Sequence, residues 1–225
     1  MPYSVIVFAS GRGSNFAALA QAARDGALPI RLDALLSDKP DAPALTLARD
    51  AGIAAIALAP RDFPDRASFD RAIFARAAEF APDLIVLAGY LRVIDAGVVE
   101  AWRGRIINIH PSLLPKYPGL HTHRRVLAAG DAEHGASVHF VTAELDGGPV
   151  IAQIHLAVVP GDTPESLAAR LLPLEHRLLV ATVDALARGR VALGADGIEL
   201  DGRRLPAPLR LGADGRLHGA GAAVG

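Results

Sequence analysis

The sequence predicts an α/β fold with an open, mostly parallel, twisted sheet that has helices on both faces and antiparallel strands in its C-terminal half. The first observation is that short apolar runs alternate with longer helical patterns in the first half of the chain, as successive βαβ units do. The second is that glycines close several of the helical patterns. The third is an apolar stretch interrupted by Asp146-Gly147-Gly148, which indicates two strands joined by a turn.

Composition limits the classes of function. The 225 residues are 51% hydrophobic and carry a formal net charge of -1, which argues against a nucleic-acid-binding protein and against a disordered chain. A small molecule is therefore the favoured partner. The chain has no cysteine, which excludes thiol nucleophiles, disulfides and thiolate metal sites and fits a reducing cytoplasm. No apolar run reaches the ~20 residues that span a bilayer, and no secretion signal follows Met1.

The first half of the chain supplies the parallel strands. Apolar, β-branched runs predict strands, and the Ala- and Leu-rich segments between them predict helices. The predicted strands are residues 4–10, 30–37, 53–58 and 84–89, and the predicted helices are residues 16–26, 42–52, 67–80 and a short one through Val99 and Trp102. The aromatic residues of the third helix share one face, so we expect them in the core.

A glycine-containing turn, Gly11-Arg12-Gly13-Ser14-Asn15, follows the first predicted strand. Glycine lets a ligand approach the backbone, and the N–H groups of Gly13, Ser14 and Asn15 at a helix start can hold an anion such as phosphate. A tight connection capped by Ser14 or Asn15 is an equally good interpretation. A phenylalanine replaces the third glycine of the dinucleotide fingerprint and no Gly-Lys-Ser/Thr occurs, so a monophosphate or sugar phosphate is favoured.

A polar pair closes the next predicted strand. Asn108 and His110 alternate with three isoleucines, so their side chains share one side of the strand at its carboxyl end. Ligands of open α/β sheets bind at that end. The following residues, 111–119, include three prolines and a glycine, which predict an ordered turn or a mobile loop. An isolated Asn-x-His triplet is also compatible with a hydrogen-bonded strand end of no special function.

The C-terminal half predicts a helix at 121–130, two strands within 135–159 and a long helix that begins at Asp162 or Thr163 and ends at Gly189. Pro173 falls inside the long helix, and we expect it to kink or split that helix. A small hairpin is predicted at 196–208, and the Gly- and Ala-rich residues 211–225 are predicted to be a disordered tail.

Two strings carry a family resemblance. NIHPSLLPKYPG, residues 108–119, resembles the active-site segment of the formyltetrahydrofolate-dependent formyltransferases. Its continuation, GLHTH, is most similar to the members that act on glycinamide ribonucleotide. HGASVHFVTAELDGGPVIAQ, residues 134–153, is similar to a second block of the same family, and the resemblance as a whole covers residues 3–208.

The resemblance implies a Rossmann-like formyltransferase fold in a single domain, residues 1–210. Residues 1–102 would form its phosphate- and nucleotide-binding half and residues 103–210 its catalytic and folate half. The implied reaction moves the formyl group of 10-formyltetrahydrofolate, the cosubstrate, to the amine of glycinamide ribonucleotide in de novo purine biosynthesis.

The resemblance also assigns site residues. Asn108, His110 and Asp146 match catalytic residues of the family. The residues that match its nucleotide-binding positions are Gly13, Ser14, Asn15 and Glu175. Those that match its folate-binding positions are Arg66, Leu91, Arg92, Val93, Ile94, Asn108, Thr142, Ala143, Glu144 and Leu145. Leu172 stands where a polar substrate contact is expected, which departs from the pattern.

These residue types suit formyl transfer. Attack by an amine on a formyl carbon creates an oxyanion, to which the amide of Asn108 and a protonated imidazole of His110 can donate hydrogen bonds. A carboxylate near His110 would raise the pKa of that imidazole and could help to move the proton that the amine loses. Asp146 is the candidate carboxylate. We expect direct transfer without a covalent enzyme intermediate.

Other interpretations remain open. Asp146 lies in an Asp-Gly turn and can serve the turn alone, and the apolar residues 91–94 can simply continue the core. A formyltetrahydrofolate hydrolase, or another formyltransferase of the superfamily, is the alternative enzyme. A nucleotide-cofactor oxidoreductase would explain only the glycine turn, and a non-catalytic folate- or nucleotide-binding protein would tolerate loss of His110. We expect no metal, because His121 and His123 lack an established ligand spacing. We also expect no nucleic-acid or membrane partner, and a homodimer stays open.

Overall fold

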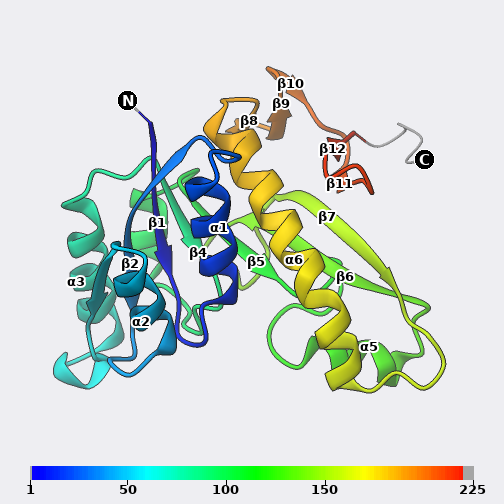
Figure 1. Ribbon diagram of the computed structural model, residues 1–225, viewed down its shortest axis with the longest axis horizontal. Coiled ribbons are helices and arrows are strands. Elements are labelled where there is room, and N and C mark those ends of the chain that lie inside the picture. The colour runs from blue at the N-terminus through cyan, green and yellow to red at the C-terminus, as the bar shows by residue number, and fades with distance from the viewer. Residues whose placement is uncertain (1, 220–225) are drawn as a thin grey trace. The chain divides into compact units, whose positions relative to one another are not determined.

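The computed structural model describes residues 2–219, which form two compact units. Unit 1 is the described chain up to Asn108 together with Val141–Ala143, and unit 2 is Ile109–Phe140 together with the described chain from Glu144 onward. Each unit has strands and helices of its own (Figure 1). Within the described residues, no helix combines the length and the apolar character needed to cross a membrane.

Unit 1 is a parallel sheet whose strands alternate with helices, as the sequence predicted. Its strands lie in the order β5-β4-β1-β2-β3, and every pair is parallel. In chain order the elements are β1 (Tyr3–Phe8), α1 (Ser14–Arg24), β2 (Ile30–Ser37), α2 (Pro43–Asp50), β3 (Ala54–Ala57), the 3-10 turn η1 (Pro60–Asp62), α3 (Arg66–Ala78), β4 (Leu84–Leu87), α4 (Ala96–Ala101) and β5 (Ile106–His110). The last two residues of β5 belong to unit 2.

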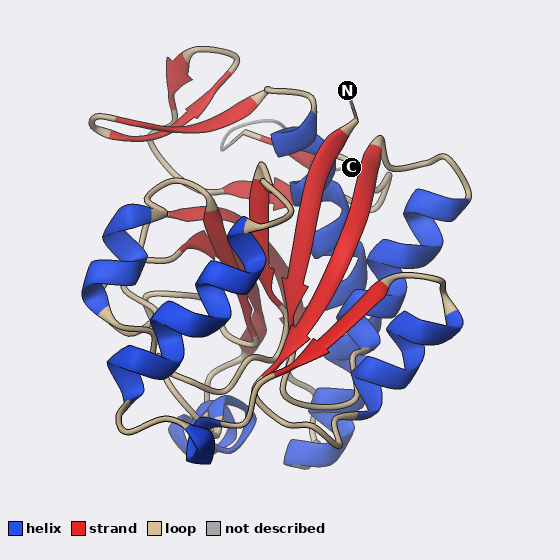
Figure 2. Cartoon of the chain, turned by 90° about the vertical axis from the view of Figure 1, so that its left-hand side faces the viewer, coloured by secondary structure: helices blue, strands red, loops and turns tan. Residues whose placement is uncertain are grey.

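The core of unit 1 follows from the alternation of side chains along its strands. Ile6 and Phe8 of β1 are fully buried and pack in one cluster with the aromatic residues of α3. The Phe8 and Phe74 rings lie 5.0 Å apart between centroids, so the predicted core position of the α3 aromatics is confirmed. Helices are visible on both sides of the strands (Figure 2), because neighbouring strand residues present apolar side chains to opposite faces.

Unit 2 contains antiparallel strands, which confirms the prediction for the C-terminal half. Its elements are α5 (Thr122–Ala129), β6 (Glu133–Phe140), β7 (Val150–Ala157), α6 (Pro164–Ala187), β8 (Val191–Gly194), β9 (Gly197–Leu200), β10 (Arg203–Arg204), β11 (Leu209–Leu211) and β12 (Leu217–His218). The strand order is β12-β11-β7-β6, with β6 and β7 antiparallel, and a separate three-stranded sheet has the order β10-β9-β8. Figure 1 shows α6 running across β6 and β7, against which it packs.

Helix α6 begins where the sequence predicted but is not split at Pro173. Thr163 caps it, and the Ser166 side chain reciprocates in a capping box. The helix is continuous from Pro164 to Ala187 with Pro173 inside it. Pro173 is exposed, so the carbonyl that loses its helical partner one turn earlier lies on the side where water can replace the missing donor.

The C-terminal segment has more structure than the sequence predicted. The expected hairpin at 196–208 forms β9 and β10, and β8 adds a third strand. Beyond it, β11 pairs in parallel with β7, and β12 pairs with β11 inside the segment for which disorder was predicted. Leu209 is fully buried, and the Arg177 side chain of α6 donates hydrogen bonds to the carbonyls of Gly212 and Ala213. Residues 220–225 lie outside the described part of the chain.

Candidate active site

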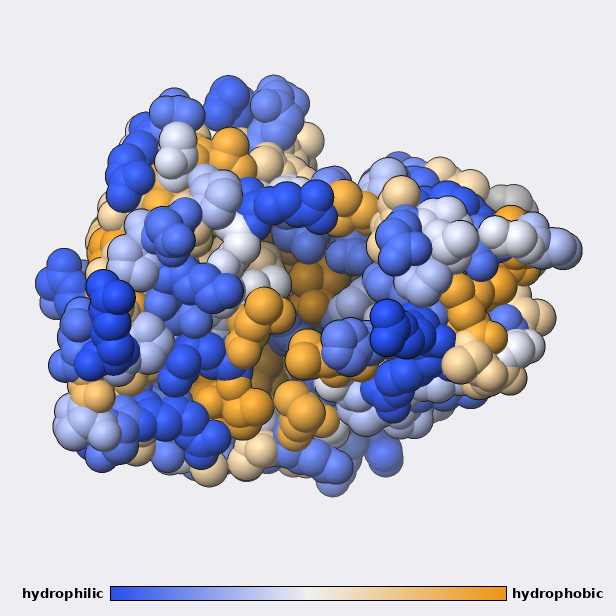
Figure 3. Space-filling model, turned by 90° about the horizontal axis from the view of Figure 1, so that it is seen from below, coloured by the Kyte–Doolittle hydropathy of each residue, from blue (hydrophilic) through white to orange (hydrophobic). Residues whose placement is uncertain are grey.

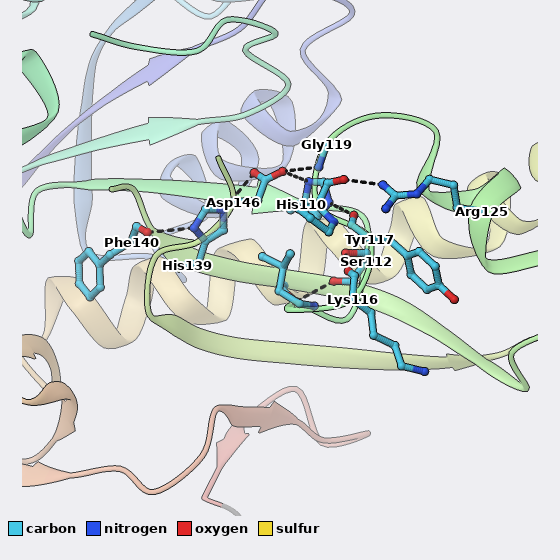
Figure 4. A network of polar contacts seen from close by, with 12 residues as sticks. His110, Ser112, Lys116, Tyr117, Gly119, Arg125, His139, Phe140 and Asp146 are labelled. Carbon is cyan, nitrogen blue, oxygen red and sulfur yellow. Dashed lines mark hydrogen bonds and ion pairs between the residues drawn. The ribbon is translucent and has the colours of Figure 1, made fainter. Parts of the chain in front are cut away.

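Two of the predicted catalytic side chains, His110 and Asp146, lie together in unit 2. His110 is the last residue of β5, and Asp146 lies in the turn between β6 and β7. The Nδ1 atom of His110 is 3.4 Å from Oδ2 of Asp146, and both side chains are 8% exposed (Figure 4). An imidazole and a carboxylate at this distance in a buried setting influence each other's protonation strongly.

The Tyr117–Gly119 segment contacts both of these side chains. The Tyr117 carbonyl oxygen is 2.9 Å from Nε2 of His110, and the Gly119 N–H donates to Oδ2 of Asp146 at 2.8 Å. Because a carbonyl oxygen only accepts, Nε2 of His110 must carry the hydrogen of this bond. The other ring nitrogen, Nδ1, then faces the carboxylate.

The electrostatics of His110 differ from the sequence prediction. Burial lowers the pKa of His110, while the Tyr117 carbonyl and the Asp146 carboxylate act in the opposite direction without outweighing it. The predicted raising effect of the carboxylate is therefore present, but the predicted net increase is wrong because burial penalises the imidazolium. For Asp146, burial alone would raise the pKa, yet the His139 ring, the Gly119 N–H and His110 together hold it below its usual value.

His139 is a site residue that the sequence analysis missed. Its Nε2 lies 3.6 Å from Oδ1 of Asp146, so the carboxylate sits between two imidazoles. Its Nδ1 donates to the backbone carbonyl of Phe140 at 2.9 Å, and the side chain is 3% exposed. A usable signal was present: Ser137 and His139 are polar residues at alternate positions of a strand that ends shortly before Asp146.

Asn108, the third predicted catalytic residue, belongs to unit 1. It pairs with Leu87 in the parallel register of β4 and β5, and its side chain is partly buried. Asn108 and His110 are two positions apart on β5, so the pleat directs both side chains to one face of the strand.

The loop after His110 is held by buried hydroxyl groups. The Ser112 side chain, fully buried, donates to the carbonyl of Lys116 at 2.7 Å. The Ser137 hydroxyl donates to the Ser112 carbonyl at 2.7 Å and accepts from the Leu114 N–H at 3.0 Å. These bonds give Ser112 a structural part in the loop.

The glycine turn in unit 1 leads directly into helix α1. Helix α1 begins at Ser14, Gly13 precedes it with φ of 77°, and no side chain caps the first turn. Of the two interpretations of this turn, the one in which Ser14 or Asn15 caps the helix is therefore not the arrangement found. A Cβ on Gly13 would lie 2.7 Å from the Cβ of Ala44, so packing as well as backbone conformation requires glycine here. The Oδ1 atom of Asn15 is buried without a hydrogen-bond partner.

The predicted folate-binding residues fall in both units. Arg66 is exposed at the first position of α3, and the Arg92 guanidinium stacks 4.7 Å above the Phe69 ring. Leu91 and Val93 are exposed, whereas Ile94 is buried. Thr142 and Ala143 belong to unit 1, and Glu144 and Leu145 to unit 2.

Apolar residues contribute visibly to the molecular surface (Figure 3). Large apolar side chains that are exposed within the described chain are Leu47, Leu91, Val93, Leu120, Leu145 and Val159. Leu91, Val93 and Leu145 are among the predicted folate-binding residues, and Leu120 follows Gly119 in the loop beside His110.

The remaining predicted site residue, Glu175, is partly buried on α6, as is Leu172 one turn earlier. A separate surface pocket of about 410 Å³ in unit 1 is lined by Asp38, Lys39, Pro40, Asp41, Ala59, Pro60 and Arg61. None of the predicted site residues lines it. Within residues 2–219, no group of three or more His, Cys, Asp or Glu side chains is arranged to hold a metal ion.

Comparison with known proteins assigns this arrangement to a family. The family model described as formyl transferase matches residues 3–183. The phosphoribosylglycinamide formyltransferase of Escherichia coli (strain K12) is 44% identical over 203 residues, which are 90% of this chain and 96% of that protein. The trifunctional purine biosynthetic protein adenosine-3 of Homo sapiens is 36% identical over 193 residues, which are 86% of this chain and 19% of that protein.

Solved structures agree. The phosphoribosylglycinamide formyltransferase of Coxiella burnetii has a TM-score of 0.88 and 42% identity, with 91% of this chain and 96% of that chain covered. A formyltetrahydrofolate deformylase from Pseudomonas putida KT2440 has a TM-score of 0.78 and 28% identity, with 89% of this chain and 70% of that chain covered. The predicted fold class is confirmed by these likenesses.

Proposed function

The chain belongs to the formyl transferase family, and from that premise we propose that it transfers the formyl group of 10-formyltetrahydrofolate to the amine of glycinamide ribonucleotide. The product is formylglycinamide ribonucleotide, a step of purine biosynthesis. The observation that carries the proposal is the pairing of His110 with Asp146 at the end of β5, the strand that also bears Asn108.

The catalytic groups act on the tetrahedral intermediate. The amine nitrogen bonds to the formyl carbon, and the carbonyl electron pair moves to oxygen, where the Asn108 amide and the His110 ring donate hydrogen bonds. Asp146, held as a carboxylate, accepts the proton that the amine loses. Breaking the carbon bond to the folate nitrogen, with protonation of that nitrogen, then yields tetrahydrofolate.

The depressed pKa of His110 defines how it takes part. A neutral imidazole with its hydrogen on Nε2 still donates one hydrogen bond, which a developing oxyanion strengthens. Since the hydrogen is on Nε2, which donates to the Tyr117 carbonyl, the ring donates to a substrate oxygen by exchanging that contact, while Nδ1 keeps facing Asp146. No covalent enzyme intermediate is required.

The substrates have separate binding groups. We assign the nucleotide phosphate to the backbone of Gly13, Ser14 and Asn15, a role supported by the uncapped start of α1. Glu175 is the candidate partner of the glycinamide group. The candidate folate contacts are the backbone of residues 91–94, residues 142–145 and Arg66. The exposure of the Leu91 and Val93 side chains supports a contact at residues 91–94.

One assay tests the proposal. Purified protein is mixed with 10-formyltetrahydrofolate, and glycinamide ribonucleotide, water alone or charged initiator tRNA is offered as acceptor while tetrahydrofolate formation is followed spectroscopically. We expect release of tetrahydrofolate only with the ribonucleotide. Release of tetrahydrofolate at the same rate in water alone would instead indicate a hydrolase. This second candidate is supported by the likeness to the Pseudomonas putida deformylase.

A further inference from the structure

The loop from Ala88 to Asp95, between β4 and α4, presents its central residues to the surface. The Leu91 side chain is 67% exposed and that of Val93 is 47% exposed. The loop has no regular secondary structure, so its main chain is not fixed by a helix or strand ladder. Something outside the loop must therefore set the positions of its N–H and C=O groups.

At the start of the loop, the residue that holds the main chain is Ser10, which follows β1. The Ser10 N–H donates to the Gly89 carbonyl at 3.0 Å, and the Ser10 hydroxyl accepts from the Leu91 N–H at 3.0 Å. The same hydroxyl donates to Oδ1 of Asp38 at 2.6 Å. Ser10 is 3% exposed. A buried hydroxyl that both donates and accepts has a fixed orientation, so it places the Leu91 amide firmly.

At the end of the loop, the residue that holds the main chain is Asp70 of α3. Its Oδ2 accepts from the Asp95 N–H at 2.8 Å, and the side chain is fully buried. Burial raises the pKa of this carboxyl, while the Asp95 N–H and nearby arginines act in the opposite direction. Asp95 in turn caps α4 by accepting from the Gly97 N–H at 3.0 Å. The hydrogen bond therefore fixes where the loop ends and the helix begins.

We infer that Ser10 and Asp70 are positioning residues for the formyl donor: each is buried, and together they hold the main chain of residues 91–94 from its two ends. The inference rests on the proposed function, in which that main chain receives the folate. Neither residue is exposed to a ligand, so both act through the loop. Their loss weakens the folate contact and leaves the amine acceptor and the catalytic groups unaffected.

The first test is Ser10→Ala, with Ser4→Ala as the matched control. Ser4 lies on β1, is also buried, and its hydroxyl also donates to a carboxylate, that of Asp33 on β2, but at the end of β1 opposite to the one that Ser10 follows. We expect Ser10→Ala to raise KM for 10-formyltetrahydrofolate about tenfold, with KM for glycinamide ribonucleotide and kcat within about twofold of the parent, since one hydrogen bond is lost. Ser4→Ala changes none of the three.

The second test compares Asp70→Asn with Asp70→Ala. Asparagine keeps an oxygen that can accept from the Asp95 N–H, whereas alanine does not. The asparagine variant should keep KM for the folate near the parent value, and the alanine variant should raise it. If Ser10→Ala fails to fold, the comparison of Asp70→Asn with Asp70→Ala still tests whether the loop anchors affect folate binding.

A substrate-free measurement separates this inference from the proposed function. Amide hydrogen exchange should accelerate at Leu91 in Ser10→Ala and at Asp95 in Asp70→Ala, relative to the parent and to Ser4→Ala. Unchanged exchange at both amides, or equal increases of the two KM values in Ser10→Ala, overturns the inference. If the parent transfers no formyl group but exchange responds as stated, the proposed function fails and the positioning of the loop stands.

Discussion

Two irregular loops of this protein differ in what they offer a ligand and in how they are held. The Ala88–Asp95 loop of unit 1 is anchored at its ends by buried side chains from other elements, and it presents main chain. The loop of unit 2 that follows His110 instead carries contacts to the catalytic side chains themselves, through Tyr117 and Gly119. The difference indicates that the proposed role of the unit 1 loop rests on its backbone shape, which many side chains tolerate, whereas the backbone of the unit 2 loop orients particular side chains, His110 and Asp146.

The sharpest way to break this comparison is to replace the catalytic groups of unit 2 and the adjoining Asn108. Asn108→Ala, His110→Ala and Asp146→Asn should each lower kcat by ~10² or more, because each removes a donor or acceptor that acts in the transition state. Steady-state kinetics with both substrates measure the effect. Circular dichroism is the control for folding, and in Asp146→Asn the new amide oxygen can still accept from the Gly119 N–H. A folded His110→Ala variant with near-parent turnover contradicts the assignment.

The alternating strands and helices of unit 1 were predictable because each apolar run is long enough for one strand and several of the helices end at a glycine. His110 and Asn108 were predictable because they interrupt a β-branched strand at its carboxyl end. His139 was missed although Ser137 and His139 alternate at the end of its strand, since polar alternation is ordinary in a strand and does not name the contact partner. Only the fold shows that the ring lies 3.6 Å from Asp146.

Other differences have equally specific causes. Burial reversed the expected direction of the pKa of His110, because the sequence shows a neighbouring charge but not the loss of solvent. The C-terminal hairpin was hidden by the Gly- and Ala-rich composition around it. Its anchors are the apolar Leu209 and Leu211, which are buried when β11 pairs with β7.

A smaller effect is expected where unit 1 offers backbone. Gly13→Val should raise KM for glycinamide ribonucleotide about tenfold and leave kcat unchanged, because the left-handed φ of 77° and the nearby Ala44 force the turn to shift away from the phosphate. Kinetics at varied ribonucleotide concentration check this. Gly26→Val is the control for backbone strain: Gly26 has φ of 70° just after α1 but open space around it, and it lies outside the proposed phosphate turn. An equal KM change in both variants would refute the phosphate assignment.

The comparison can be sharpened further within the unit 2 loop. Asp131 accepts from Nζ of Lys116 and from the Tyr117 hydroxyl, each at 2.9 Å, and so ties down the segment that contacts His110. Asp131→Ala should lower kcat roughly threefold, because a looser Tyr117 positions the imidazole less well. The control is Asp184→Ala, which removes the ion pair between Asp184 of α6 and Arg188, the residue just after that helix. If Asp131→Ala and Asp184→Ala have the same kcat in steady-state kinetics, the Asp131 contacts have no catalytic consequence.

The smallest expected effect is a change in folding stability with pH, which comes from a histidine pair between α5 and β6. Nδ1 of His123 and Nε2 of His134 are 2.8 Å apart, and burial lowers the pKa of His134 from 6.5 to about 4. The unfolded state therefore binds more protons than the folded state between these values, so stability is full above pH 6.5 and declines as the pH falls through this window. At pH 5.5 the loss should be roughly 1 kcal/mol relative to pH 7.5. Urea unfolding at both pH values measures it, and His134→Leu should remove this part of the pH dependence. If the parent and the variant lose the same free energy of unfolding between the two pH values, protonation of His134 does not contribute to the pH dependence.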